Sequence, residues 1–152
     1  MKSLINFITD FLVWVFNAIK RLFIILFEKF LAVNIFEKGI VINTILAFAA
    51  VVMPVAQYYI FEQYFFINNP IAHHMIGIAA VMLVTIYFPG LISMIARVGL
   101  NTLYLAWMLY LQLAHEVSKA PYEIMAGYYL NILAPVIYIV LALASGLLFR
   151  ET

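Results

Sequence analysis

Three histidines and one glutamate have side chains suited to metal or haem chemistry: His73, His74, His115 and Glu116. Imidazole and carboxylate groups from neighbouring helices can bind zinc, copper or iron, and two histidines on facing helices can hold a haem. The spacing matches no dedicated metal motif, and adjacent histidines on a helix point about 100° apart. Two interpretations therefore stay open: a metal or haem site at these four residues, or polar caps at helix ends.

Other catalytic chemistry finds no support in the sequence. The chain has no cysteine, which excludes disulfides, thiolate metal sites and a cysteine nucleophile. It contains no G-x-S-x-G motif, no glycine-rich phosphate loop and no H-E-x-x-H motif. The sequence therefore favours a non-catalytic protein.

Composition points to a membrane as the surroundings of most of the chain. Of the 152 residues, 68% are hydrophobic and 10% are charged, whereas a soluble domain carries about 25% charged residues. A chain of this length cannot hide so much apolar surface from water, because small domains have a high ratio of surface to volume. The net charge of +1 gives no basic face for nucleic acid. We expect an all-α integral membrane protein whose partners are the lipid bilayer and other membrane protein subunits, or further copies of itself.

Residues 1–38 are predicted to form an amphipathic helix that lies in the membrane surface. The apolar residues of 11–27 favour insertion by about 4–7 kcal/mol, but Lys20 and Arg21 cost about 5–7 kcal/mol there, so the interface is favoured over crossing. A polar stripe, whose members share one side of this helix, either faces water or forms a seam against a partner protein, and Asp10 and Arg21 are the candidate partner contacts on it. The stripe consists of Ser3, Asn6, Asp10, Asn17, Arg21 and Glu28.

Residues 39–152 are predicted to form a transmembrane helical bundle. No charge occurs between Lys38 and Glu62, and a helix over this stretch is about 34 Å long, enough to cross a bilayer core. Pro54 is expected to kink this helix rather than end it. Pro89-Gly90 predicts a tight turn, although one kinked span over residues 71–96 is the alternative and would leave three spans. The four predicted spans cover residues 39–61, 71–88, 91–114 and 124–149.

Polar residues inside the predicted spans are candidates for helix packing and partner contacts. Asn43 and Gln57 share one side of the first span with small residues. Small residues let helix backbones approach, and amides can hydrogen-bond across helices. Arg97 and Asn101 lie on one side of the third span. Arg97 can reach the near membrane interface, pair within the bundle, or pair with another subunit.

The basic residues predict the orientation of the chain. Four spans place both termini on one side of the membrane, with Arg97 close to that side and only Lys119 on the other. Loops rich in lysine and arginine stay in the cytoplasm. We therefore expect both termini in the cytoplasm of a bacterial inner membrane protein and the histidines at the outer face. The basic residues on the side of the termini are Lys2, Lys20, Arg21, Lys29, Lys38 and Arg150.

Three functions remain open from the sequence. The first is a non-catalytic subunit with a scaffold or assembly role in a larger multi-protein membrane complex, because the predicted spans carry polar and small stripes. The second is a metal- or haem-binding redox subunit that uses the outer histidines and glutamates. The third is a small oligomeric channel or carrier whose path is lined by Asn43, Gln57, Arg97 and Asn101.

Overall fold

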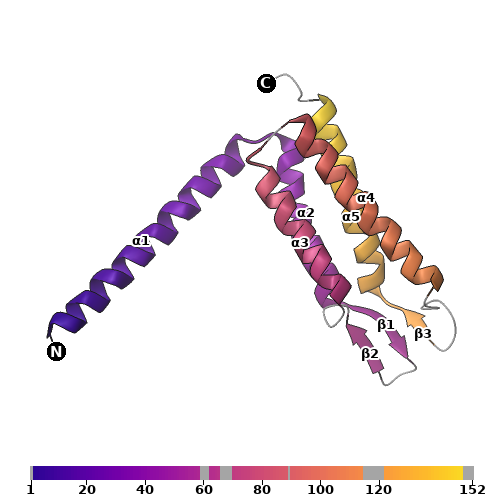
Figure 1. Ribbon diagram of the computed structural model, residues 1–152, viewed down its shortest axis with the longest axis horizontal. Coiled ribbons are helices and arrows are strands. Elements are labelled where there is room, and N and C mark those ends of the chain that lie inside the picture. Colours follow the sequence, from indigo (N-terminus) through magenta and orange to yellow (C-terminus); the bar gives the residue numbers. More distant parts are fainter. Residues whose placement is uncertain (1, 59–61, 66–69, 89, 115–121, 149–152) are drawn as a thin grey trace. The chain divides into compact units, whose positions relative to one another are not determined.

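The computed structural model describes residues 2–58, 62–65, 70–88, 90–114 and 122–148. The chain divides into two compact units, Met1–Val33 and Asn34–Thr152. Helix α1 (Lys2–Ala32) makes up the first unit, and the remaining elements belong to the second (Figure 1). The helices of the second unit are α2 (Ile35–Val52), α3 (Pro70–Thr85), α4 (Leu91–Ala114) and α5 (Ala126–Leu148). Its strands are β1 (Pro54–Tyr58), β2 (Glu62–Phe65) and β3 (Tyr122–Ile124).

A break at Val33 and Asn34 separates α1 from α2. Asn34 is the N-cap of α2, and its side-chain oxygen accepts hydrogen bonds from the backbone N–H groups of Phe36 and Glu37, both at 3.0 Å. Such a cap satisfies N–H groups that have no partner inside the first turn of a helix. The predicted helix over residues 1–38 is therefore interrupted, and Glu37 and Lys38 belong to α2.

Helices α2, α3, α4 and α5 form an antiparallel bundle (Figure 1). Helix α2 packs against α3 and α5, and α4 packs against the same two helices. Helix α3 ends at Thr85, and α4 begins after Gly90, whose φ of 140° suits glycine alone. The chain therefore reverses between these helices, and residues 71–96 do not form one kinked helix.

Three helices in the described part of the chain are long and apolar enough to cross a membrane: Ile35–Val52, Leu91–Tyr110 and Ala126–Leu148. The apolar stretch of α3, His73–Thr85, is shorter. These lengths confirm the helical class and fit an integral membrane protein.

Pro54 ends α2, and the prediction that it would kink a longer helix is wrong. Met53 has φ −82° and ψ 150°, an extended conformation, and its N–H donates the last helical hydrogen bond to the Ala49 carbonyl oxygen at 3.0 Å. A proline disfavours the helical conformation of the residue before it, because its Cδ clashes with that residue. The predicted span over 39–61 therefore stops at Val52, and the chain continues as β1.

A small antiparallel sheet joins the two connections at one end of the bundle, in the strand order β2-β1-β3. Ala56 of β1 is the partner of Tyr64 in β2 and of Ile124 in β3. The register shifts between Pro54 and Ala56, as expected where a proline cannot donate to the ladder. The sheet lies where α2 ends and α5 begins (Figure 1). The predicted all-α architecture lacks this sheet, because it assigns residues 54–58 to a helical span and leaves residues 62–70 and 115–123 as connections between spans.

Small residues line the most extensive helix contact, between α2 and α5. A Cβ atom added at Gly127, near the start of α5, would lie 2.5 Å from the carbonyl oxygens of both Met53 and Pro54. Only glycine therefore fits where the end of α2 passes the start of α5. The buried alanines of this contact, which allow close approach of the helices, are Ala47, Ala50, Ala134 and Ala142.

Replacing Gly127 by alanine is expected to lower the stability of the bundle. Backbone atoms of Met53 and Pro54 would have to move, and overpacking of this kind costs about 1–3 kcal/mol. Gly77→Ala is the matched control, because no atom lies within 4 Å of a Cβ at that helical position, and alanine favours a helix over glycine by about 1 kcal/mol. Thermal unfolding in detergent measures both variants. A Tm for Gly127→Ala at or above the wild-type value would contradict the close contact.

Candidate functional site

A buried ion pair between Glu37 and Arg97 is the centre of the candidate site. Glu37 lies in the first turn of α2, and Arg97 lies in the second turn of α4. The Nη1 atom of Arg97 is 2.6 Å from the Oε1 atom of Glu37, and the two side chains are 3% and 8% exposed. Removing two charges from water is costly, and their attraction offsets the cost only when further hydrogen bonds are made.

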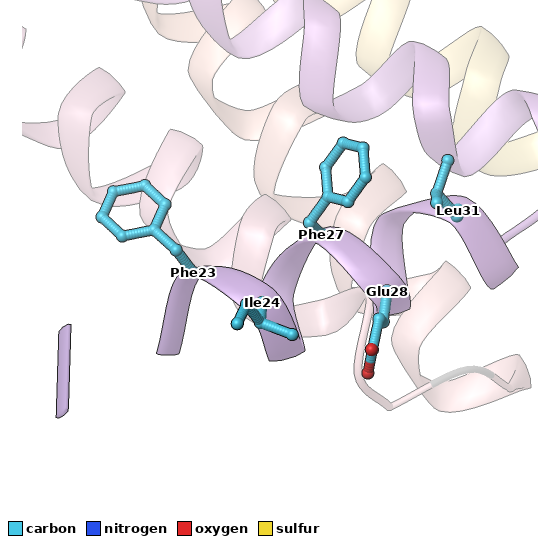
Figure 2. Close-up of a pocket in the computed structure, with 5 residues that line it drawn as sticks. All are labelled: Phe23, Ile24, Phe27, Glu28 and Leu31. Carbon is cyan, nitrogen blue, oxygen red and sulfur yellow. The ribbon is translucent and has the colours of Figure 1, made fainter. Parts of the chain in front are cut away.

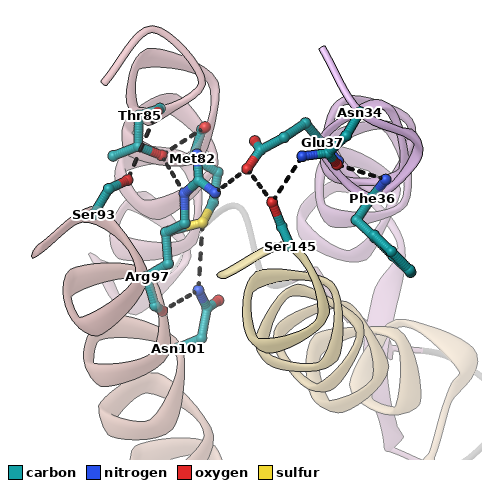
Figure 3. A network of polar contacts seen from close by, with 9 residues as sticks. All are labelled: Asn34, Phe36, Glu37, Met82, Thr85, Ser93, Arg97, Asn101 and Ser145. Atoms are coloured by element: carbon teal, nitrogen blue, oxygen red, sulfur yellow. Dashed lines mark hydrogen bonds and ion pairs between the residues drawn. The ribbon is translucent and has the colours of Figure 1, made fainter. Parts of the chain in front are cut away.

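Hydrogen bonds from the other two helices complete the pair (Figure 3). Ser145 of α5 donates through Oγ to the same Glu37 oxygen at 2.7 Å, and Asn34 donates through Nδ2 to Ser145 Oγ at 3.2 Å. On the opposite side, the Nε atom of Arg97 donates to Thr85 Oγ1 of α3 at 2.8 Å. The charge network of Asn34, Glu37, Thr85, Arg97 and Ser145 therefore connects all four helices of the bundle.

Asn101 extends the charge network by one turn along α4. Its Nδ2 group donates to the Arg97 carbonyl oxygen at 2.8 Å and approaches the Met82 sulfur at 3.6 Å. Within the described residues, three buried atoms of the network have no hydrogen-bond partner: Glu37 Oε2, Arg97 Nη2 and Asn101 Oδ1. Unsatisfied buried groups cost about 1–3 kcal/mol each, and replacing a buried ion pair by apolar residues of similar volume is often neutral or stabilising. The network can instead favour one arrangement of the four helices, because each hydrogen bond forms only when particular helical turns lie next to each other.

A second buried polar cluster holds α2, α4 and α5 together nearer the sheet. Asn131 is fully buried, and its Nδ2 group donates to the carbonyl oxygens of Ala50 at 2.6 Å and Gly127 at 2.8 Å. Its Oδ1 atom accepts a hydrogen bond from the Tyr104 hydroxyl at 2.8 Å. This amide uses both its donors and its acceptor to connect three helices.

The sequence-predicted packing residues separate in the structure. Asn43 is buried in α2 and donates to the Ala134 carbonyl oxygen at 2.9 Å. Gln57, predicted on the same helical side, lies in β1, where it is the partner of Gln63 and Glu123. Asp10 and Arg21 are exposed on α1, in the other unit. Only Arg97 and Asn101 of this set lie in the charge network.

Only part of the predicted metal or haem site lies within the described residues. His73 and His74 are exposed near the start of α3, and the His74 ring centre is 5.0 Å from that of Trp107 on α4. His115 and Glu116 lie outside the described residues. The described part of the chain contains no group of three or more His, Cys, Asp or Glu side chains placed to hold a metal ion. The geometry of His74 fits aromatic packing between two helices.

Sequence reasoning missed the partner of Arg97. It assigned Glu37 to the end of a surface helix, although Asn34 and Glu37 have the spacing of a helix start, with a capping residue followed three positions later by glutamate. This pattern places Glu37 in the first turn of a bundle helix. The hydroxyl groups of Thr85 and Ser145 carry no comparable signal.

Removing one member of the ion pair is expected to destabilise the bundle strongly. Arg97→Met leaves the Glu37 carboxylate buried without its partner, a change that costs about 3–5 kcal/mol in buried pairs. The double variant Glu37→Gln/Arg97→Met removes both charges and is expected to recover much of that loss. Lys20→Met, at an exposed position on α1, is the control and should be close to wild type. Thermal unfolding in detergent compares the four proteins, and a double variant less stable than Arg97→Met would contradict the pairing.

Comparison of the chain with protein-family models, curated proteins and solved structures gives no match. Two features of the described residues bear on function: a bundle with an internal buried ion pair, and a separate helix with exposed apolar side chains.

Proposed function

We propose that the chain is a non-catalytic integral membrane subunit of a larger multi-protein membrane complex, with a scaffold or assembly role. In this proposal the bundle anchors the subunit in the bilayer, and α1 is the element that contacts its partners.

The exposed apolar surface of α1 is the observation that carries the proposal. The exposed large apolar side chains between Ile5 and Leu31 keep 41–69% of their surface accessible. A lone helix has no neighbour within its own unit to cover them. A helix in the membrane surface that turns Arg21 and Glu28 toward water offers lipid only part of its apolar surface, because apolar side chains fill most of the rest of its circumference. A protein partner in the membrane can cover the apolar side chains and pair the charges.

Figure 2 shows how these side chains are arranged near the end of α1. Phe23, Phe27 and Leu31 project from one side of the helix, and the carboxylate of Glu28 projects from another. A shallow surface is lined by these residues and Ile24, all of which belong to α1. It is an open face of one helix, which suits contact with a second helix better than capture of a small molecule.

The bundle interior favours a scaffold over a channel or carrier. The amides of Asn43 and Asn101 donate to the carbonyl oxygens of Ala134 and Arg97, and Arg97 is itself paired with Glu37. Polar groups engaged in this way hold helices together. This engagement with neighbouring helices supports a structural role for Asn43 and for the Glu37–Arg97 pair.

We further propose that the subunit lies in a bacterial inner membrane with both termini in the cytoplasm. The support is the distribution of lysine and arginine, which leaves only Lys119 for the opposite side. The antiparallel order of the four bundle helices is compatible with this orientation (Figure 1).

Cysteine labelling tests the orientation, because the chain has no cysteine of its own. A membrane-impermeant maleimide is expected to label Lys119→Cys in intact cells. It should label Arg150→Cys only after the membrane is permeabilised. The reverse pattern would contradict the proposed orientation.

A matched pair of triple alanine variants tests the role of α1. Replacing Phe16, Phe23 and Phe27 by alanine removes exposed apolar surface from α1, and the control replaces Ile42, Ile45 and Phe48, which are similarly exposed on α2. We expect the α1 variant to lose most of the high-molecular-weight complex on native gels in mild detergent. The control should keep it. A wild-type chain that migrates alone, or equal loss in both variants, would contradict the proposal.

A further inference from the structure

The polar stripe of α1 carries two opposite charges at a spacing that allows it to pair with a copy of itself. Asp10 and Arg21 are eleven positions apart, so they lie about 20° apart around the helix and about 16 Å apart along it. Both side chains are exposed. Among the described residues, no ion pair involves either of them.

An antiparallel pair of α1 helices makes this stripe complementary to itself. If Asp10 of one copy lies opposite Arg21 of the other, the two-fold symmetry of the pair brings the second Arg21 opposite the second Asp10. The same register places residues 2–29 of the two helices side by side. It brings Asn6 opposite Ile25 and Asn17 opposite Trp14 of the second copy. A parallel pair in equal register would instead place Asp10 against Asp10 and Arg21 against Arg21, and like charges repel.

The position of the stripe within the polar face leaves room for both a partner helix and water. Its members, from Ser3 to Glu28, span about 60° of the helix circumference, and Thr9 and Lys20 lie next to it on one side, within about 120° in total. The stripe can therefore form the seam between two packed helices while Lys20 stays toward water.

The membrane also favours the antiparallel arrangement. Two copies inserted with the same orientation are related by a two-fold axis along the membrane normal. Helices that lie in the plane of the membrane and face each other across such an axis run in opposite directions. The antiparallel pair is therefore the symmetric pair available to an α1 helix that lies in the membrane surface.

We propose that α1 pairs antiparallel with α1 of a second copy of this chain, with two reciprocal Asp10–Arg21 ion pairs. This inference rests on the proposed function, since it names the partner that covers the polar stripe of α1. The apolar remainder of α1 stays available to lipid and to other subunits.

Disulfide cross-linking of the full chain in membranes tests the register, because every cysteine would be an introduced one. Asn6→Cys and Ile25→Cys chains with different tags are co-expressed and oxidised. We expect cross-links between the two different chains, at least several-fold more abundant than those between two identical chains. A majority of Asn6→Cys homodimers would indicate a parallel pair and overturn the proposal, as would the absence of any cross-link.

Charge reversal tests the ion pairs in the same cross-linking background. Asp10→Arg and Arg21→Asp, made singly, should each lower the cross-link yield several-fold, because like charges then face each other. The double reversal Asp10→Arg/Arg21→Asp restores opposite charges in an antiparallel pair and should restore the yield. Lys20→Asp, which lies beside the stripe, is the control and should leave the yield unchanged. Unchanged yields in the single reversals, or no recovery in the double reversal, would overturn the proposal.

The outcomes separate this inference from the proposed function. If the wild-type chain migrates in a large complex on native gels but does not cross-link to a second copy, the pairing is wrong and the subunit role stands. If it cross-links but migrates as an isolated dimer, the pairing stands and membership of a larger complex is wrong.

Discussion

A carboxylate and a guanidinium buried together are the constraint on which the arrangement of the four bundle helices depends. Burying either charge alone would cost several kcal/mol, so α2 and α4 must bring Glu37 and Arg97 to the same depth. Thr85 and Ser145 then fix α3 and α5 through hydrogen bonds to the pair. At the opposite end the connections between helices pair as a sheet. The charge network therefore holds the bundle at one end, and the Asn131 cluster and the backbone ladder hold it nearer the other.

Much of the helical architecture could be predicted, because apolar runs and their breaks determine it. Predicted span 91–114 coincides with α4, and span 124–149 is close to α5 (Ala126–Leu148). The prediction failed after Val52, where the apolar run continues but α2 ends and the chain forms β1 from Pro54 onward. Apolar content alone does not separate a short strand from a helix segment. The following proline favours the extended conformation of Met53, but the same restriction at Ala134 does not end α5, which contains Pro135. A proline in the sequence therefore could not by itself locate the end of α2.

The candidate site was less predictable than the fold. Arg97 is conspicuous because it is a charge within an apolar stretch, whereas its partner Glu37 lies near a predicted boundary between two segments. Placing that boundary at residue 38 instead of at Val33–Asn34 assigned the carboxylate to the wrong segment. For Gln57 the predicted helix was too long. Gln57 was expected to share one side of a helix with Asn43, but that helix, α2, ends at Val52. For both Glu37 and Gln57, a misplaced helix boundary put the residue in the wrong element.

The side chain of Asn34 takes part in two sets of hydrogen bonds, and a single substitution would break both. It caps α2 through its side-chain oxygen, and its amide nitrogen donates to Ser145, which in turn donates to Glu37. It is also the first residue after the unit that contains α1. Removing this side chain would therefore take away the cap of α2 and, in the same step, one hydrogen-bond partner of the serine that contacts the buried carboxylate. The start of α2 and the setting of the buried charges cannot be altered independently at this position.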